Sequence, residues 1–345
     1  MQRAFPLMTS ARSTQPRYDD PPVSVSPGRE RLPAFIQAYR EDQAATRTEL
    51  VRGLGASTPF VAPKFLYDAL GSRLFDAITE LPEYYPTRTE AAIFEAHGAA
   101  MAAAIGGVGS FVDLGAGSCA KALRLLPLLL PERYIAVDIS VEYLRDSLRQ
   151  LQRIHPQLHV TGVGLDFSAA LTLPQDCVAG RPVFFYAGSS IGNFAPADAV
   201  AFLARVREQA RGGGLLIGVD LVKSSDLLVP AYDDALGVTA AFNLNLLLHL
   251  NRLIGSDFAV RDWRHVGQFN AKESRIEMHL EARRALHVRW PGGERRFAQG
   301  ERLHTENSYK YSIETFRSVL QQAGFEPATH WSDPAQWFSV FWARA

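Results

Sequence analysis

Residues 111–126, FVDLGAGSCAKALRLL, constrain the fold of this chain more than any other stretch. An apolar strand pattern passes through a glycine turn straight into a leucine-rich helical pattern, which is the layout of a loop that holds a nucleotide cofactor. Gly115, Gly117 and Ala120 fit the G-x-G-x-x-G/A spacing of dinucleotide-binding folds. Because other adenosine-bearing ligands use the same spacing, the surrounding residues have to identify the cofactor.

Strand and helix patterns alternate from residue 110 onward. The predicted strands lie within 110–117, 133–140, 159–167, 181–190 and 212–221, and the predicted helices between them end at 130, 154 and 211. This alternation predicts an α/β fold with a doubly wound parallel sheet. Ser312 then caps a predicted helix that stops at Gly324, and 328–332 with 337–345 predict a closing antiparallel hairpin. That ending suits a Rossmann-like methyltransferase sheet better than a dehydrogenase sheet.

Two blocks do not fit the sheet pattern, and we expect them to form a second, discontinuous α+β substrate domain. The predicted division is a disordered tail at 1–31, substrate domain at 32–88 and 224–309, and methyltransferase domain at 89–223 and 310–345. Within the second block, residues 232–252 predict a long helix, and RIEMHLEA at 275–282 alternates strictly, as a strand does. We expect the active site in the cleft between the two domains.

Charge and cysteine content restrict the classes of partner. The 36 Lys and Arg residues balance the 36 Asp and Glu residues, so no net basic field attracts nucleic acid. The apolar stretches are interrupted and too short to span a membrane. The two cysteines, Cys119 and Cys177, lack metal-ligand spacing and suit buried thiols in a reducing compartment. We therefore expect a cytoplasmic monomer without a metal that acts on a small molecule.

The spacing of acidic residues separates the candidate cofactors. Asp113 precedes the glycines, Asp138 ends the next strand at a position suited to both ribose hydroxyls, and Asp166 ends the third strand, where it can accept from an adenine amine. Lys121 follows the glycine turn and can meet a carboxylate. NAD places an anionic pyrophosphate here, whereas S-adenosylmethionine brings a sulfonium and an amino-acid tail. These residues together favour S-adenosylmethionine, although each alone would more often be structural.

Several long motifs give the chain a resemblance to a known family. From about residue 32 to the C-terminus it resembles the histidine-specific Nα-methyltransferases of ergothioneine biosynthesis. The motifs that carry the resemblance are PKFLYDALGSRLFDAITELPEYYPTRTEA, FVDLGAGSCAK, GSSIGNF, DLVKSSDLLVPAYDDALGVTAAFNLNLL, RIEMHL and TENSYKY. The resemblance implies transfer of three methyl groups from S-adenosylmethionine to the α-amine of L-histidine, which gives hercynine.

The resemblance also implies roles for particular residues. The residues expected to hold the cofactor are Tyr67, Gly115, Lys121, Asp138 and Asp166, and those expected to hold the amino-acid backbone are Tyr84, Gly188, Asn193 and Tyr232. Met278, Glu306 and Ser308 are expected around the imidazole, and Phe75 beside them. Tyr67 and Asn193 are the candidate catalytic residues because they would orient the reacting groups. Two positions depart from the family pattern, Ser190 in place of threonine and Asn307 in place of an apolar residue.

The residues themselves support an imidazole pocket. Glu306 and Ser308 are two apart in a predicted strand, so their side chains point to the same face. A carboxylate accepts from a ring N–H, and a hydroxyl can pair with the other ring nitrogen, so the two can read both nitrogens. Asn307 between them should point away. Without the resemblance, a solvated acid and a serine flanking a helix would be equally acceptable interpretations.

Other functions remain open at this point. A related Nα-methyltransferase for another amino acid would keep the cofactor residues and change the ring pocket. A nucleic-acid methyltransferase is disfavoured, because GSSIGNF lacks the Pro-Pro-aromatic loop that stacks a flipped base. An NAD-dependent dehydrogenase or a non-catalytic binding module would transfer no methyl group.

Overall fold

The fold is known from a computed structural model that describes residues 31–38, 42–139, 141–168, 170–174 and 176–345. The tail predicted for 1–31 therefore lies, except for Arg31, outside the described residues. No helix in this part of the chain is long and apolar enough to cross a membrane.

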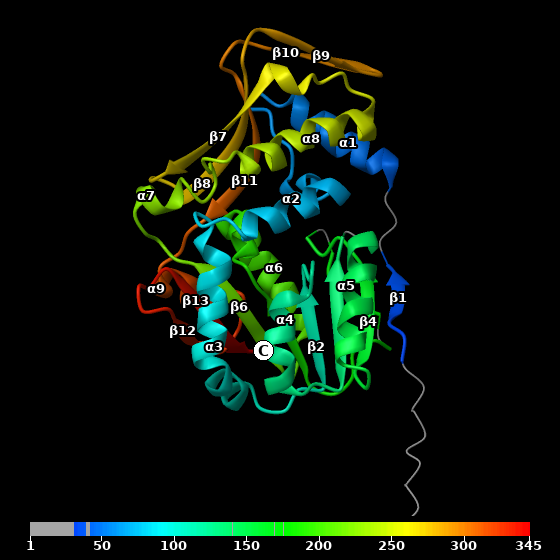
Figure 1. The fold of residues 1–345 in the computed structure, drawn as a ribbon, viewed down its shortest axis with the longest axis vertical. Helices are drawn as coiled ribbons and strands as arrows, with labels where there is room; N and C mark the ends of the chain where they lie inside the picture. Colours follow the sequence, from blue (N-terminus) through cyan, green and yellow to red (C-terminus); the bar gives the residue numbers. More distant parts are fainter. Residues whose placement is uncertain (1–30, 39–41, 140, 169, 175) are drawn as a thin grey trace, which may run out of the picture. The chain divides into compact units, whose positions relative to one another are not determined.

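The described strands include eight that form one sheet, in the order β1-β4-β3-β2-β5-β6-β13-β12 (Figure 1). Their bounds are β1 Ala34–Gln37, β2 Ser110–Leu114, β3 Arg133–Asp138, β4 His159–Gly164, β5 Pro182–Tyr186, β6 Gly214–Asp220, β12 Thr329–Ser332 and β13 Phe338–Arg344. β1 to β6 pair in parallel, β13 runs antiparallel to β6, and β12 pairs antiparallel with β13. The five predicted parallel strands and the closing hairpin are confirmed. β1 was not predicted, and it extends the sheet from the block that the sequence analysis assigned to the substrate domain.

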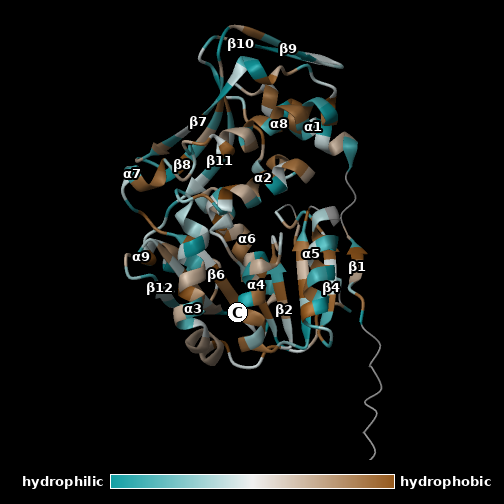
Figure 2. Ribbon diagram, in the orientation of Figure 1, coloured by the Kyte–Doolittle hydropathy of each residue, from teal (hydrophilic) through white to brown (hydrophobic). Residues whose placement is uncertain are grey.

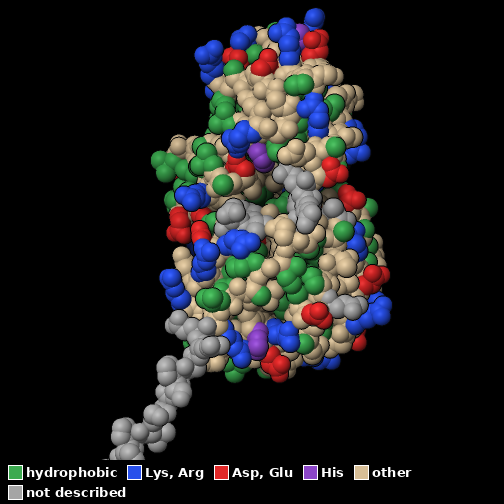
Figure 3. All heavy atoms as spheres, turned by 90° about the vertical axis from the view of Figure 1, so that its right-hand side faces the viewer, with side chains coloured by type: hydrophobic (Ala, Val, Ile, Leu, Met, Phe, Trp, Pro, Cys, Tyr) green, Lys and Arg blue, Asp and Glu red, His purple; other side chains and the backbone are tan. Residues whose placement is uncertain are grey.

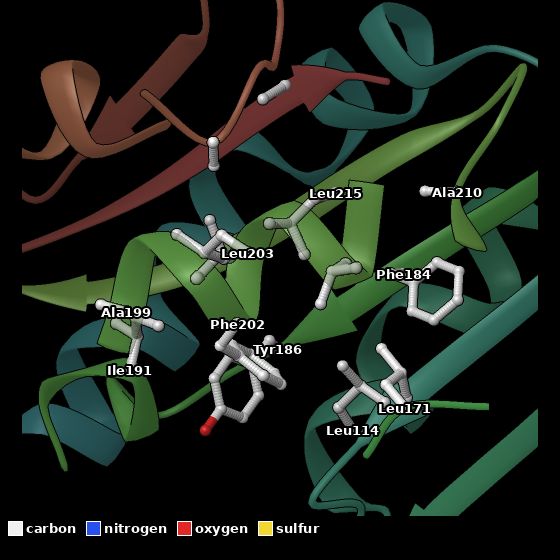
Figure 4. Close-up of a cluster of buried hydrophobic side chains, with 14 of the residues drawn as sticks. Leu114, Leu171, Phe184, Tyr186, Ile191, Ala199, Phe202, Leu203, Ala210 and Leu215 are labelled. Carbon is white, nitrogen blue, oxygen red and sulfur yellow. The ribbon is translucent and has the colours of Figure 1, made fainter. Parts of the chain in front are cut away.

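Helices cover both faces of this sheet, as a doubly wound fold requires. α3 (Tyr85–Ile105), α4 (Ala120–Leu129) and α5 (Val141–Ile154) pack on one face, and α6 (Pro196–Gln209) and α9 (Ile313–Gln322) on the other. Figure 2 shows hydrophobic residues concentrated on the strands between these layers. Figure 4 shows part of the core under α6, where Phe202 packs against Tyr186 and Leu203 lies beside Leu215.

The remaining elements build a second hydrophobic cluster. They are α1 Gln43–Gly55, η1 Pro63–Leu66, α2 Ala69–Thr79, η2 Ser190–Asn193, α7 Ser225–Leu228, α8 Val238–Ile254, η3 Val260–Asp262, β7 Trp263–Asn270, β8 Arg275–Ala282, β9 Leu286–Trp290, β10 Gly293–Phe297 and β11 Arg302–Tyr309. β11, β8 and β7 form an antiparallel sheet in that order, and β9 pairs with β10. The apolar face of β8, predicted from RIEMHLEA, packs with Leu246, Leu247 and Leu250 of α8. η2 is the exception, because it packs with the core of the large sheet.

The long helix predicted for 232–252 begins later than expected. Helix α8 starts at Val238, after a turn in which Gly237 adopts a left-handed conformation with φ of 76°. The Asp234 carboxylate accepts hydrogen bonds from the backbone N–H groups of Val238 and Thr239 at 3.0 and 2.8 Å. Because these bonds satisfy donors that a helix start leaves open, the helix begins at Val238, and Tyr232 lies in the preceding loop.

Charged side chains of both signs are interspersed on the face that Figure 3 shows.

Candidate functional site

Two cavities meet beside the carboxyl ends of the parallel strands. The small cavity is lined by Tyr67, Phe75, Ile78, Tyr84, Gly188, Ser189, Ser190, Asn193, Ala231, Tyr232, Thr239, Phe242, Met278, Glu306 and Ser308. The large cavity, of about 750 Å³, is lined by residues that include Lys64, Tyr67, Phe75, Gly115, Gly117, Asp138, Asp166, Phe167, Ser190 and Asn193. Tyr67, Phe75, Ser190 and Asn193 line both cavities. These four residues mark where the two cavities adjoin.

The glycine loop forms one wall of the large cavity. Gly115 and Gly117 have φ of 70° and 50°, in the left-handed region that glycine adopts without strain. The Asp138 carboxylate, at the end of β3, accepts a hydrogen bond from the Gly117 backbone N–H at 3.0 Å. The loop and the acid that the sequence analysis linked by spacing therefore lie in contact. Their arrangement fits an adenosine-bearing ligand whose ribose lies over the end of β3.

Asp166 lies on the same cavity wall and is only 6% exposed. Its carboxylate forms an ion pair with Lys64 of η1 at 3.0 Å, and Lys64 also contacts Glu49 of α1 at 2.9 Å. The sequence analysis missed Lys64, although it lies in the quoted motif PKFLYD. This pairing ties the segment that follows β4 to the segment that carries Tyr67.

Two residues of the sequence pattern that favoured S-adenosylmethionine, Asp113 and Lys121, are not among those that line the large cavity. Asp113 is 3% exposed and accepts a hydrogen bond from the Tyr134 hydroxyl at 2.7 Å. Burial raises the pKa of Asp113 to about 7, so this acid belongs to the core beneath the loop and not to the cavity wall. Lys121, on the first turn of α4, points instead to Glu90. Asp113 taken alone is therefore structural, as a single acid of this pattern more often is.

Glu90 of α3 connects the two predicted binding regions, and the sequence analysis missed it. Its side chain is 1% exposed, forms an ion pair with Lys121 at 2.8 Å and accepts from the Gly188 backbone N–H at 2.9 Å. Gly188 has φ of 73°, and a Cβ there would lie 2.5 Å from the Lys121 Nζ atom. The left-handed φ favours glycine at this position, and a Cβ would displace the flexible Lys121 side chain. Glu90 holds a residue expected at the cofactor and a residue expected at the substrate.

A β-bulge brings Glu306 and Ser308 to the small cavity. Along β11, Leu303 lies opposite Leu280 of β8, but Glu306 lies opposite Met278. The extra residue between them shifts the alternation, so that Leu303 and Glu306 face the same side although they are three apart. The sequence analysis predicted that Glu306 and Ser308 share a face, and they do. The bulge decides that this is the face with the cavity.

Aromatic rings form the other walls of the small cavity. Tyr67 packs edge-to-face with Phe75 and Phe242, and Tyr84 packs in the same way with Phe75 and Tyr232. Burial raises the pKa values of the Tyr67, Tyr84 and Tyr232 phenols well above their ordinary value. At neutral pH these phenols stay protonated, so they can orient a ligand by hydrogen bonds but cannot act as bases.

Glu306 is the carboxylate of the small cavity, and it is 6% exposed. Burial raises its pKa to about 7, against the opposing effect of the Lys310 ammonium group. Asn307 lies on the opposite strand face, where its amide oxygen is 2.9 Å from His304 Nε2, and it does not line the cavity. Ser190, the other departure, lines both cavities and keeps its hydroxyl. A buried acceptor beside a buried hydroxyl suits a polar ring with an N–H group.

The described residues contain no group of three or more His, Cys, Asp or Glu side chains arranged to hold a metal ion. Cys119 and Cys177 are both buried and free. The site therefore consists of a large cavity bordered by the glycine loop and the Asp138 carboxylate and a small aromatic and polar cavity, which share four lining residues.

Comparison with known proteins agrees with this arrangement. Residues 46–345 match the family described as "Histidine-specific methyltransferase, SAM-dependent". The chain is 40% identical over 304 residues to a histidine N-alpha-methyltransferase of Mycolicibacterium smegmatis, covering 86% of this chain and 94% of the relative. It is 38% identical, with the same coverage, to a histidine N-alpha-methyltransferase of Mycobacterium tuberculosis. An ergothioneine biosynthesis protein 1 of Neurospora crassa is 32% identical over 77% of this chain, which spans 31% of that longer protein.

Proposed function

Since the chain belongs to the family of SAM-dependent, histidine-specific methyltransferases, we propose that it transfers three methyl groups from S-adenosylmethionine to the α-amine of L-histidine. The product is hercynine, and the reaction is the first step toward ergothioneine. The observation that carries this proposal is the junction of the two cavities at Tyr67, Phe75, Ser190 and Asn193. The proposed cofactor side and the proposed substrate side adjoin at these four residues.

The large cavity is the proposed cofactor site. Gly115 lets the backbone approach the nucleoside, Asp138 accepts from the ribose hydroxyls, and Asp166 accepts from the adenine amine. Lys121 lies behind Gly188 and would meet the carboxylate of the amino-acid tail. When bound, S-adenosylmethionine supplies an electrophilic methyl group on a sulfonium.

The small cavity is the proposed histidine site. Glu306 accepts from one imidazole nitrogen, Ser308 pairs with the other, and Met278 packs against the ring. Tyr84, Gly188, Asn193 and Tyr232 hold the amino-acid backbone, which places the α-amine at the junction of the cavities. A buried carboxylate with a buried hydroxyl rejects apolar side chains, because such a ligand would leave both groups without partners.

Positioning accounts for the catalysis. The α-amine must be neutral and in line with the methyl group, and an amine with a pKa near 8 supplies enough neutral form at cellular pH. Tyr67 and Asn193 orient the amine and do not remove its proton, since the Tyr67 phenol stays protonated. Over three transfers, one histidine and three cofactor molecules give hercynine, three S-adenosylhomocysteine molecules and three protons.

A panel of amino acids tests the substrate assignment. Release of S-adenosylhomocysteine is measured with histidine and with the other standard amino acids, each at saturating cofactor. Histidine alone should support rapid release. Equal release with another amino acid would favour the related Nα-methyltransferase, and no release with any of them would reject a free amino-acid substrate.

Replacing Asp138 by Ala should weaken S-adenosylmethionine binding by about 1–3 kcal/mol, because the ribose hydroxyls lose their acceptor. Isothermal calorimetry with cofactor alone measures the change. Asp138→Asn keeps an acceptor for Gly117 N–H and serves as the control, with a smaller loss. Unchanged affinity in Asp138→Ala would remove the glycine loop from the cofactor site, and NADH binding in its place would restore the dehydrogenase alternative.

Substitution of Glu90 should change the affinities for both cofactor and histidine, and the Ala and Gln variants should distinguish the two effects. Glu90→Ala leaves Lys121 unanchored and the Gly188 N–H without its acceptor, so the affinities for cofactor and for histidine should each fall by about 1–2 kcal/mol. Glu90→Gln keeps an acceptor for Gly188 and should restore histidine affinity while cofactor affinity stays reduced. Binding is measured for each ligand separately. Equal effects of the two variants on histidine would show that Gly188 does not depend on Glu90.

The sheet-bearing part of the chain is the proposed methyltransferase domain, and the part around α8 and β7–β11 is the proposed substrate domain. We propose a monomer that works in the cytoplasm on a small molecule. The free, buried state of both cysteines supports a reducing compartment.

A further inference from the structure

Lys310 lies directly beneath the hydroxyl groups of the small cavity. Its side chain is completely buried, and its ammonium nitrogen contacts three acceptors: Asp220 Oδ2 at 2.7 Å, Ser308 Oγ at 2.8 Å and the Tyr232 hydroxyl at 2.9 Å. An ammonium group has three hydrogens and accepts none. Each hydrogen of Lys310 therefore has an acceptor, and two of these acceptors line the cavity.

Asp220 anchors this lysine from the end of β6. The carboxylate is completely buried, contacts Lys223 at 2.5 Å on its other oxygen, and accepts from the Tyr85 hydroxyl. Burial alone would raise the pKa of Asp220, but the Lys310 and Lys223 ammonium groups outweigh it and hold the pKa below its ordinary value. Asp220 is therefore ionised and fixes the Lys310 ammonium group in place.

The hydroxyl hydrogens of Ser308 and Tyr232 determine what the pair can donate into the cavity. The hydroxyl oxygens of Ser308 and Tyr232 are 2.8 Å apart, so one hydrogen lies between them. Both oxygens also accept from Lys310. Two hydroxyls carry two hydrogens, and one is used within the pair. One hydroxyl hydrogen is left to be donated to a ligand in the cavity.

We propose that Lys310 is a positioning residue that fixes the polarity of the ring pocket, so that the Ser308–Tyr232 pair presents one donor beside the Glu306 acceptor. The pocket then selects a neutral ring that has one N–H group and one bare nitrogen. A ring with only one of these features leaves a buried polar group without its partner. This inference rests on the proposed function and adds the residue that orients the groups reading the ring.

Lys310 also acts on Glu306 through its charge. The groups that act on the Glu306 carboxylate are the Lys310 ammonium, which follows the end of the same strand, and the phenols of Tyr67, Tyr84 and Tyr232. The ammonium group is the single cation among them, within the described residues, and it lowers the pKa of Glu306. Removal of this charge should leave more Glu306 protonated at neutral pH, and a protonated carboxyl is a poorer acceptor for a ring N–H.

Lys310→Met tests the proposal, with Lys223→Met as the matched control. Both lysines are buried, both pair with Asp220, and each variant leaves Asp220 one lysine, but Lys223 contacts neither Ser308 nor Tyr232. We expect Lys310→Met to raise KM for histidine about tenfold or more, with cofactor affinity unchanged. The acid limb of kcat/KM for histidine should move to higher pH, whereas Lys223→Met should show neither change. The titration of free histidine is common to both variants and cancels in the comparison.

If Lys310→Met and Lys223→Met give the same KM and the same pH profile while the wild type methylates histidine, the inference is wrong and the proposed function stands. If the wild type does not methylate histidine, the proposed function itself fails. Histidine analogues test the pocket polarity without any substitution. The wild type should accept 1,2,4-triazolylalanine, which has an N–H and a bare nitrogen, and discriminate against thiazolylalanine, which lacks the N–H, and pyrrolylalanine, which lacks the bare nitrogen. Equal use of pyrrolylalanine and histidine would overturn the single-donor arrangement even if Lys310→Met did not fold.

Discussion

Glu306→Ala should lose histidine affinity by about tenfold to a hundredfold while its affinity for S-adenosylmethionine stays nearly the same. The lost interaction is a charge-assisted hydrogen bond to a ring N–H, worth roughly 1.5–3 kcal/mol in a buried site. Because Glu306 lines the small cavity and not the large one, we expect the cofactor affinity to stay unchanged. Methyl transfer at varied histidine and saturating cofactor gives KM, and calorimetry gives the cofactor affinity.

The same substitution should relax selectivity. A buried carboxylate without a partner penalises apolar side chains, and its removal lifts that penalty, so phenylalanine and tryptophan should be used better relative to histidine than by the wild type. Asn307→Ala is the matched control, because Asn307 is the next residue of β11 but faces away from the cavity. It should leave both KM and the ranking of amino acids unchanged. If Glu306→Ala behaves like Asn307→Ala, Glu306 does not read the ring.

Glu306→Gln should make the ligand-free protein more stable than the wild type at pH 8, by roughly 3 kcal/mol. The pKa of Glu306 is about 7 in the folded protein against an ordinary value of 4.5, because burial disfavours the charged form. A carboxyl whose pKa is raised on folding binds more protons in the folded state, so wild-type stability falls as pH rises from 4.5 to about 7. At 1.36 kcal/mol per pKa unit, the loss at and above pH 7 is about 3 kcal/mol.

Urea unfolding of both proteins at several pH values measures this difference. The advantage of Glu306→Gln should be near zero at about pH 4.5, grow through the range up to 7 and then level off. Glu95→Gln, an exposed substitution on α3, should stay within about 0.5 kcal/mol of the wild type throughout. If the stability difference between Glu306→Gln and the wild type did not change with pH, the ionised Glu306 carboxylate would not destabilise the folded protein. Together with the loss in histidine affinity, the predicted gain would show that the carboxylate is kept for substrate recognition at the expense of stability.

The sheet could be predicted from the sequence because each of its signals is local. The glycine turn after β2, the alternating strand and helix patterns and the Ser312 cap depend on neighbouring residues, and all appear as expected. The strand β1 was not predicted, because its four residues at the sheet edge depend on pairing with β4 and carry no strong local strand pattern. The start of α8 was predicted too early, because residues 232–252 were taken as one helix although Asp234 and the left-handed Gly237 form a turn before Val238.

The predicted site residues are brought together, but the groups that hold them were missed. Lys310 follows Ser308 by two, so the alternation that placed Glu306 and Ser308 on one face also points to Lys310. The sequence does not show that its partner is Asp220, which lies 90 positions earlier on β6. Glu90 is another acid on a helix until the fold brings Lys121 and Gly188 to it. Such residues act through contacts between segments that are distant in the sequence, and residue spacing does not predict those contacts.

Mass spectrometry of histidine incubated with the protein and S-adenosylmethionine tests the central claim most directly. The account predicts conversion of histidine to a product that carries three additional methyl groups, with fragmentation placing all three on the α-nitrogen, and three S-adenosylhomocysteine molecules formed per product. Product formation should fall in Glu306→Ala at limiting histidine. Unmodified histidine, or methyl groups on the imidazole ring, would contradict the account.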